Sequence, residues 1–302
     1  MKIQAISTGK VKITQNWRLG QGSGLKRLMN TLLDNEFTAW LPIYVWLIEH
    51  PEGLILIDTG IPADANKRIW FPPFMPLLQR AATFEMTPEE EIGPQLQQSG
   101  FAPADVRWVI LTHLHQDHDG GLHYFPQAEF IVSQTEWAAA TGLKGRMNGY
   151  LNQRWPEWFQ PTLINFEPPS YKSFAGHHTL TNAGDVHLLP TPGHSPGHMS
   201  IIVEDGNVSF FFAGDASYTE ELLLAEKPDG IGPEPQKQQE THQRILAYAA
   251  QKPTVYLPSH DPEAQKRLAN RAAVLTNKNA ASIWGGDVSS RWAEAGVSPV
   301  AL

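Results

Sequence analysis

The sequence contains no cysteine among its 302 residues. Disulfide bonds and thiolate metal ligands are therefore excluded, and any metal ion has to be held by nitrogen or oxygen atoms. Basic residues are also sparse: 23 lysines and arginines stand against 31 aspartates and glutamates, which gives a formal net charge of −8. Nucleic acids and anionic membrane surfaces bind to basic patches, so we expect neither as a partner.

The sequence also lacks a long hydrophobic run. No apolar stretch is long enough to cross a bilayer, and residues 1–15 do not contain the continuous apolar core of a secretory signal. We therefore expect no membrane insertion and a cytoplasmic location. Hydrophobic residues make up 41% of the chain, which is ordinary for a globular protein. The expected organisation is one domain over residues 1–302, with an apolar loop inserted at 61–84 and a C-terminal extension at 271–302 to which the sequence assigns no role.

Four metal-capable side chains stand close together directly after an apolar run. The run at 108–111, Trp-Val-Ile-Leu, predicts a buried strand. The loop that leaves this strand has the spacing HxHxDH and contains His113, His115, Asp117 and His118. Ligands on one face of a helix would be three or four residues apart. This spacing instead suits a loop that directs its ligands to two neighbouring points, and imidazole nitrogens with a carboxylate suit zinc, iron, cobalt or manganese.

Polar side chains follow other predicted strands in the same way. Asp58 follows the apolar run at 54–57, and His194, Asp215 and His260 each follow a later run. A single polar residue at a strand end usually has a structural role in the loop. Histidine or aspartate at several strand ends favours a common functional site. We expect Asp58 to contact a histidine ligand rather than a metal ion.

Two further segments have clear local patterns. Residues 2–6 and 10–14 predict two short strands that form a hairpin at Gly9. Residues 87–90, Thr-Pro-Glu-Glu, predict the capped start of a helix, which we expect to be interrupted at 93–94, Gly-Pro.

The segment at 61–84 is rich in aromatic residues and prolines, and so many prolines exclude a long helix or a central strand. Two interpretations remain open for it. The first is an irregular loop that covers the core. The second is an apolar wall of a substrate cleft, or a contact between the subunits of a homodimer. Phe71 and Phe74 are its candidate substrate-pocket residues.

The strand-end residues together resemble the site of the metallo-β-lactamase superfamily, and the resemblance extends over residues 42–261. The matching residues are His113, His115, Asp117, His118, His194, Asp215 and His260. The fold implied is of the α/β class, an αβ/βα four-layer sandwich. Two mixed β-sheets pack face to face in it, helices cover the outer faces, and metal ions lie at one edge.

The resemblance also implies two divalent metal ions, zinc in the first place, with iron, cobalt or manganese as alternatives. His113, His115 and His194 would hold one ion. Asp117, His118 and His260 would hold the other, and Asp215 would bridge both. Asp58 matches the early structural aspartate of the superfamily.

A tyrosine three residues after Asp215, Tyr218, is similar to the arrangement in the N-acyl homoserine lactonases, a quorum-quenching branch of the superfamily. This resemblance implies opening of a small-molecule lactone ring by attack of a metal-bound hydroxide. Tyr218 would donate to the oxyanion, and Asp117 would supply a proton to the leaving group. Gln116, a candidate substrate-pocket residue, departs from the apolar or aromatic residue that is frequent there, and this departure concerns the acyl-chain preference more than the chemistry.

Three alternatives stay open. The first is another hydrolase, acting on a carboxylic ester, an organophosphate, or a thioester as in glyoxalase II-like enzymes. Glutathione recognition would need a basic C-terminal region, and Lys266, Arg267 and Arg271 are the residues available for it. The second is iron redox chemistry on the same fold. The third is a binding protein with a structural metal, although such sites normally close with four ligands and seven candidates are present here.

Overall fold

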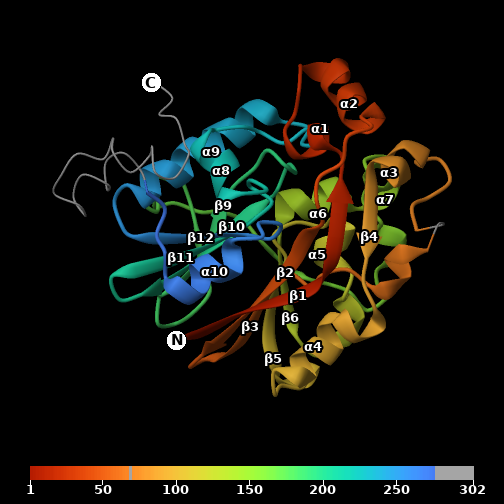
Figure 1. The fold of residues 1–302 in the computed structure, drawn as a ribbon. Helices are drawn as coiled ribbons and strands as arrows, with labels where there is room; N and C mark the ends of the chain where they lie inside the picture. The colour runs from red at the N-terminus through yellow and green to blue at the C-terminus, as the bar shows by residue number, and fades with distance from the viewer. Residues whose placement is uncertain (68–69, 276–302) are drawn as a thin grey trace.

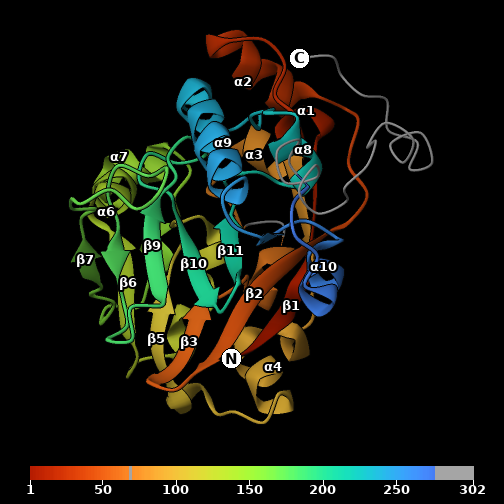
Figure 2. The same ribbon diagram turned by 90° about the vertical axis from the view of Figure 1, so that its left-hand side faces the viewer.

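Two mixed β-sheets form the centre of the protein in the computed structural model, which describes residues 1–67 and 70–275 (Figures 1 and 2). Within these residues the first sheet has the strand order β4-β1-β2-β3-β5-β6-β7 and the second has the order β12-β11-β10-β9-β8. The first sheet consists of β1 (Lys2–Ile13), β2 (Leu41–His50), β3 (Gly53–Ile57), β4 (Ala82–Glu85), β5 (Val106–Ile110), β6 (Glu129–Ser133) and β7 (Thr162–Ile164). The second consists of β8 (His178–Thr179), β9 (Val186–Pro190), β10 (Met199–Asp205), β11 (Val208–Gly214) and β12 (Thr254–Pro258).

Alternation of side chains along the strands explains why the sheets pack in layers. In β2, Trp46 and Ile48 belong to the core between the two sheets, whereas Leu47 points to the opposite face. In β10, Ile201 lies in the central core and Ile202 faces outward. Both faces of both sheets are therefore apolar, and each sheet needs a layer of helices to cover it.

Helices cover the two outer faces. Apolar side chains of α4 (Ile92–Gln98) and α6 (Gln134–Ala140) pack on the outer face of the first sheet. Those of α8 (Glu220–Leu224) and α9 (Pro235–Ala249) pack on the outer face of the second, and α9 lies across it in Figure 2. The arrangement confirms the predicted αβ/βα sandwich. The remaining helices are α1 (Gln15–Arg18), α2 (Gly24–Leu33), α3 (Pro76–Ala81), α5 (Gln116–Asp119), α7 (Gly142–Met147) and α10 (Ala264–Asn270).

The hairpin predicted at Gly9 is wrong. β1 is one continuous strand that pairs antiparallel with β2, and its register shifts between Ser7 and Lys10. Gly9 has φ 100°, and a Cβ on it would lie 2.7 Å from Met86 Cβ. The glycine thus permits a bulge within the strand, and the pairing with β2 on both sides of it prevents the chain from turning back.

The interruption predicted at residues 93–94 is also wrong. The capping box of Thr87 and Glu90 is present, but it closes a single 3₁₀ turn, Pro88–Glu90. The α-helix begins two residues later and contains Pro94 in its first turn. A proline there breaks no helical hydrogen bond, because the first N–H groups of a helix have no partner within it.

The inserted segment at 61–84 is less irregular than its composition suggests. It contains the helix α3, and its end forms β4, which pairs antiparallel with β1 at the edge of the first sheet. Most of the C-terminal extension, residues 276–302, lies outside the described residues. Among the helices that the structure describes, none is long and apolar enough to cross a membrane.

Candidate metal centre

The ends of four strands bring the candidate ligands to one edge of the sandwich. β3 runs parallel to β5, and β11 runs parallel to β12, so their carboxyl ends meet at that edge. Asp58 follows β3, the HxHxDH loop follows β5, Asp215 follows β11, and His260 lies just beyond β12. His194 joins them from the loop between β9 and β10.

Three histidines form the first group of ligand atoms. His115 Nδ1 lies 3.0 Å from His113 Nε2 and 3.1 Å from His194 Nε2. Burial and the neighbouring imidazoles hold the pKa of His113 and of His115 well below its usual value, so both rings are neutral. Neutral rings with converging nitrogens are what a borderline metal ion binds.

A second group lies next to the first. His260 Nε2 lies 3.5 Å from Asp117 Oδ2, and His118 Nε2 lies 4.0 Å from Asp117 Oδ1. These three residues come from the HxHxDH loop and from the end of β12, which are far apart in the sequence. Only the packing of the two sheets makes them neighbours.

Asp215 lies between the two groups. Its Oδ1 is 3.4 Å from His118 Nε2 and 3.3 Å from His260 Nε2, while its Oδ2 is 3.6 Å from His194 Nε2. Burial alone would raise the pKa of this carboxyl, but His260 and His118 hold it well below its usual value. Asp215 therefore presents one carboxylate oxygen to each group.

The chemistry of these atoms fits divalent metal ions. Within the part of the chain that the structure describes, His118 Nε2 and Asp215 Oδ1 are buried without a hydrogen-bond partner. Buried polar atoms are normally paired, because an unpaired one loses its hydration without compensation. A cation among these nitrogen and oxygen atoms would satisfy both.

The two histidines of the second group, His118 and His260, are each oriented by an oxygen atom on the far side of the ring. His118 Nδ1 donates to Asp58 Oδ2 at 2.8 Å, and the backbone N–H of Thr112 donates to Asp58 Oδ1 at 2.8 Å. His260 Nδ1 lies 2.9 Å from the carbonyl oxygen of Pro42. Asp58 thus lies where the sequence predicted, beside a histidine, and directs His118 Nε2 toward the cluster. Its φ of 62° is unusual for a residue other than glycine.

Asp229 performs the same task for His194, and the sequence analysis missed it. His194 Nδ1 donates to Asp229 Oδ2 at 2.7 Å, and the backbone N–H of Gly232 donates to Asp229 Oδ1 at 2.6 Å. Burial would raise the pKa of Asp229, but His194 and these hydrogen bonds lower it. No apolar strand precedes Asp229, so the pattern that singled out Asp58 was absent.

A buried glutamate in the first turn of α6, Glu136, joins the two histidine loops. Glu136 accepts hydrogen bonds from the backbone N–H of Leu114 at 3.1 Å and of Gly197 at 3.0 Å, and from Ser195 Oγ at 2.7 Å. A Cβ at Gly197 would lie 2.0 Å from the backbone nitrogen of Glu136, so only glycine allows this approach. Glu136 therefore fixes the loop of His113 and His115 against the loop of His194.

His198, a second histidine of the same loop, supports the backbone of Asp215. His198 Nε2 accepts from the backbone N–H of Asp215 at 3.0 Å, and Thr191 Oγ1 lies 2.9 Å from Nδ1. Burial lowers the pKa of His198 to about 3, so the ring stays neutral and can accept this bond. The sequence analysis did not single out His198, which lies four residues after His194.

A narrow cavity of about 70 Å³ opens onto the cluster. Its walls include Phe71, Gln116, Asp117 and Tyr218, four of the five residues predicted to contact the substrate. Phe74, the fifth, does not line this cavity and is 63% exposed. A half-buried aromatic residue, Trp17, also lines this cavity.

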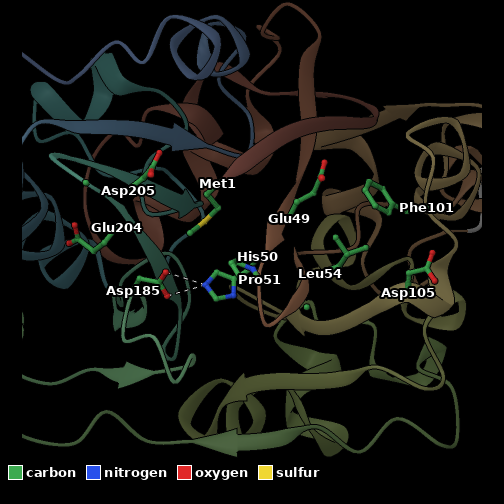
Figure 3. Close-up of a pocket in the computed structure, with 12 residues that line it drawn as sticks. Met1, Glu49, His50, Pro51, Leu54, Phe101, Asp105, Asp185, Glu204 and Asp205 are labelled. Carbon is green, nitrogen blue, oxygen red and sulfur yellow. Dashed lines mark hydrogen bonds and ion pairs between the residues drawn. The ribbon is translucent and has the colours of Figure 1, made fainter.

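A more spacious cavity, about 840 Å³, lies elsewhere (Figure 3). It is lined by residues at the other ends of the strands, including His50 at the end of β2 and Asp205 at the end of β10. His50 Nε2 lies 3.1 Å from an oxygen of Asp185, as the dashed lines in Figure 3 show. This pairing joins the two sheets and occupies His50 Nε2. The metal-capable cluster lies at the opposite edge of the sandwich.

Comparison with known proteins decides the family. A family model described as the metallo-beta-lactamase superfamily matches residues 38–260. The chain belongs to the metallo-beta-lactamase superfamily. The matched range begins before β2 and ends at His260, so it includes the whole candidate centre.

Relatives of this superfamily member include lactonases. N-acyl homoserine lactonase AiiA of Bacillus thuringiensis subsp. kurstaki is 32% identical over 229 residues, which cover 75% of this chain and 84% of that enzyme. An N-acyl homoserine lactonase of Bacillus cereus is 34% identical over 191 residues, covering 62% of this chain and 69% of that enzyme.

A solved structure agrees with these relatives. An N-acyl homoserine lactone hydrolase, with N-hexanoyl-L-homoserine bound at its catalytic metal centre, matches with a TM-score of 0.72 and 27% identity. The match covers 88% of this chain and 95% of that one. The family and these likenesses show a metal-dependent hydrolase and confirm the predicted resemblance.

In this superfamily member, Asp58→Ala and Asp229→Ala are each expected to weaken metal binding by about 10- to 100-fold, because each removes the carboxylate that orients a histidine without removing a ligand. Competition with a chromophoric chelator measures the affinity. Asp64→Ala is the matched control, since Asp64 is exposed and its side chain forms an ion pair with Lys67 at the surface. Affinities equal to that of the control would contradict the orienting role.

Proposed function

We propose that this protein hydrolyses the lactone ring of N-acyl homoserine lactones with the help of two divalent metal ions, most simply zinc. The observation that carries the proposal is the position of Tyr218. Its ring stacks on His260, with centroids 5.4 Å apart, inside the cavity that opens onto the cluster. A hydroxyl beside the ligands, together with the lactonase activity named for the relatives, supports an acyl substrate whose carbonyl oxygen gains negative charge.

The proposed ligand sets follow the distances. His113, His115 and His194 would hold one ion. Asp117, His118 and His260 would hold the other, and Asp215 would contribute one oxygen to each. When bound, the ions would polarise the lactone carbonyl and lower the pKa of water to roughly 7, which makes hydroxide accessible at neutral pH.

Tyr218 is the proposed oxyanion donor. Burial and the carboxylates of Asp215 and Asp229 raise the pKa of its hydroxyl well above the usual value, so it keeps its proton. A neutral phenol donates a hydrogen bond to the carbonyl oxygen, and the bond strengthens as that oxygen becomes negative.

Asp117 is the proposed proton carrier. Its side chain is 15% exposed, more than that of His118 or Asp215, and it lines the cavity. Asp117 Oδ2 takes the proton that the attacking water loses and passes it to the ring oxygen when the C–O bond of the lactone breaks. The products are one carboxylate and one alcohol, and one proton is released to solvent.

We propose that the acyl chain of the bound substrate extends away from the metal centre along Gln116 and Phe71. Phe71→Ser should raise KM for long acyl chains more than for short ones, because it removes apolar contact area from the cavity wall. Phe74→Ser is the matched variant, since Phe74 is outside that wall. Equal effects of the two substitutions on the chain-length profile of KM would contradict the assignment of Phe71.

Phe74 is instead proposed as part of a contact between two copies of the chain, because a large aromatic side chain at 63% exposure suits an interface. Light scattering of the wild type and of Phe74→Ser tests this. A wild-type monomer, or a dimer unaffected by the substitution, would contradict the contact.

The function itself is tested with a pH-indicator assay on homoserine lactones of graded acyl length. One proton is expected per lactone opened, with no release after the metal has been removed by a chelator. A glutathione thioester and a phosphotriester are assayed in parallel. Turnover of either, without turnover of lactones, would assign the protein to another hydrolase class of the superfamily.

A further inference from the structure

The ring of Tyr218 is held between the two ligand groups, but its hydroxyl hydrogen is not fixed by these contacts. The ring stacks on His260 and meets His194 edge-on, with centroids 6.1 Å apart and planes at 81°. The residue is 4% exposed. Packing thus leaves the phenol oxygen in one place, whereas rotation about the C–O bond still decides where the O–H points.

A second residue restricts this rotation. Trp17 Nε1 lies 2.9 Å from the Tyr218 hydroxyl oxygen. An indole N–H can only donate, so the tyrosine oxygen is the acceptor in this bond. The hydroxyl hydrogen of Tyr218 then has to point away from Trp17. Both residues line the cavity that Asp117 and Asp215 also line.

We infer that Trp17 is a positioning residue of the active site, whose indole N–H occupies one side of the Tyr218 oxygen and directs the Tyr218 hydrogen into the cavity. There the hydrogen meets the carbonyl oxygen of the substrate. The inference rests on the proposed function to the extent that Tyr218 is the oxyanion donor. Trp17 itself touches Tyr218 and acts on the reaction through it.

The backbone of Trp17 is fixed independently of its indole ring. Its N–H donates to the carbonyl oxygen of Thr14 at 3.0 Å, and its carbonyl oxygen accepts from the N–H of Gly230 at 2.7 Å. A Cβ at Gly230 would lie 1.9 Å from the carbonyl oxygen of Asn16, so a glycine is required for this contact. The next residue back along the chain, Asp229, orients His194.

Because the main chain of Trp17 is held by Gly230, the substitution Trp17→Phe can test the indole hydrogen bond by itself. The loop of Asp229 and Gly230 anchors Trp17 through main-chain atoms, which Trp17→Phe does not change. Phenylalanine keeps an aromatic ring in the cavity wall and removes the N–H. The variant therefore tests the hydrogen bond with little change in packing.

The first measurement requires no turnover. The protein has 10 tryptophans, so the metal-loaded enzyme is expected to give up to that number of indole N–H signals in a nitrogen-proton NMR spectrum, and Trp17→Phe identifies one by its loss. Tyr218→Phe should shift that same signal toward lower proton frequency, because its acceptor has gone. An unmoved Trp17 signal in Tyr218→Phe would overturn the inference, whatever the substrate proves to be.

The second measurement is a double-mutant cycle with Trp17→Phe, Tyr218→Phe and the combined variant, at equal metal content. Trp17→Phe should lower kcat about three- to tenfold, the effect of one neutral hydrogen bond, with little change in KM. In the Tyr218→Phe background the same substitution should lower kcat no further. Trp158→Phe, at an exposed tryptophan outside the cavity, is the control and should match the wild type.

The outcomes separate a positioning role from a packing role. Equal losses from Trp17→Phe in both backgrounds, or no loss in either, would overturn the inference. If lactones are not the substrate, the cycle is measured with the ester, thioester or phosphotriester that is turned over. A shifted indole signal without lactone turnover would then refute the proposed substrate and leave the bond between Trp17 and Tyr218 established.

Discussion

Asp215→Asn is expected to abolish tight binding of both metal ions and to lower kcat/KM by at least about 10³-fold. The substitution keeps the shape of the side chain and removes its negative charge. Asp215 presents Oδ1 to His118 and His260 and Oδ2 to His194, so one change affects both groups of ligands. Losses of this size are typical when charge stabilisation at a reacting centre is removed.

Elemental mass spectrometry of protein expressed with ample metal measures the first effect. The wild type should contain close to two equivalents, and Asp215→Asn much less than one. Asp205→Asn changes the same residue type at the other end of the sandwich, where Asp205 pairs with Arg271, and should retain the wild-type content. A wild type that never exceeds one equivalent would rule out the two-ion mechanism.

Asp117→Asn is expected to lower kcat by about 10²- to 10⁴-fold, the range for loss of a general acid or base. Asparagine retains a carbonyl oxygen that can face a metal ion, but its amide cannot accept and return a proton at Oδ2. The loss should exceed that of Tyr218→Phe, which we expect to be about 10- to 100-fold because metal ions would carry most of the oxyanion charge.

The control for Asp117→Asn is the carboxylate two positions further along the same short helix. Asp119 Oδ2 accepts from Trp155 Nε1 at 2.6 Å, and Asp119 belongs to none of the three groups of metal-capable residues found in the described chain. Asp119→Asn should therefore retain metal content and most of kcat. Rates are compared at equal metal occupancy, and a loss in Asp117→Asn no larger than that in Asp119→Asn would exclude Asp117 as proton carrier.

Local sequence patterns predicted much of this architecture. The buried strands appear as short apolar runs, and the HxHxDH spacing marks the loop after β5 as a metal-binding loop. Asp58 could be placed beside a histidine because it too follows an apolar strand. These features depend on residues that are neighbours in sequence, and strand periodicity or loop spacing reports directly on such neighbours.

The wrong predictions concern residues for which the local sequence is compatible with two conformations and contacts with a distant segment select one of them. Gly9 is compatible with a hairpin turn or a bulge, and pairing with β2 along the whole of β1 selects the bulge. Phe71 and Phe74 have similar sequence surroundings, yet Phe71 lines the cavity at the cluster and Phe74 faces outward. Composition could indicate an apolar loop but not the direction of each side chain.

The family, the fold and the identity of the candidate ligands were therefore determined by the sequence itself. Only the tertiary structure decided three contacts around them: Asp229 with His194, Glu136 with both histidine loops, and Trp17 with the Tyr218 hydroxyl. Trp17 and Tyr218 are 201 positions apart. The hydrophobic periodicity of neighbouring residues cannot predict such a pair, because the contact forms only when the two sheets pack and the N-terminal segment lies over their edge.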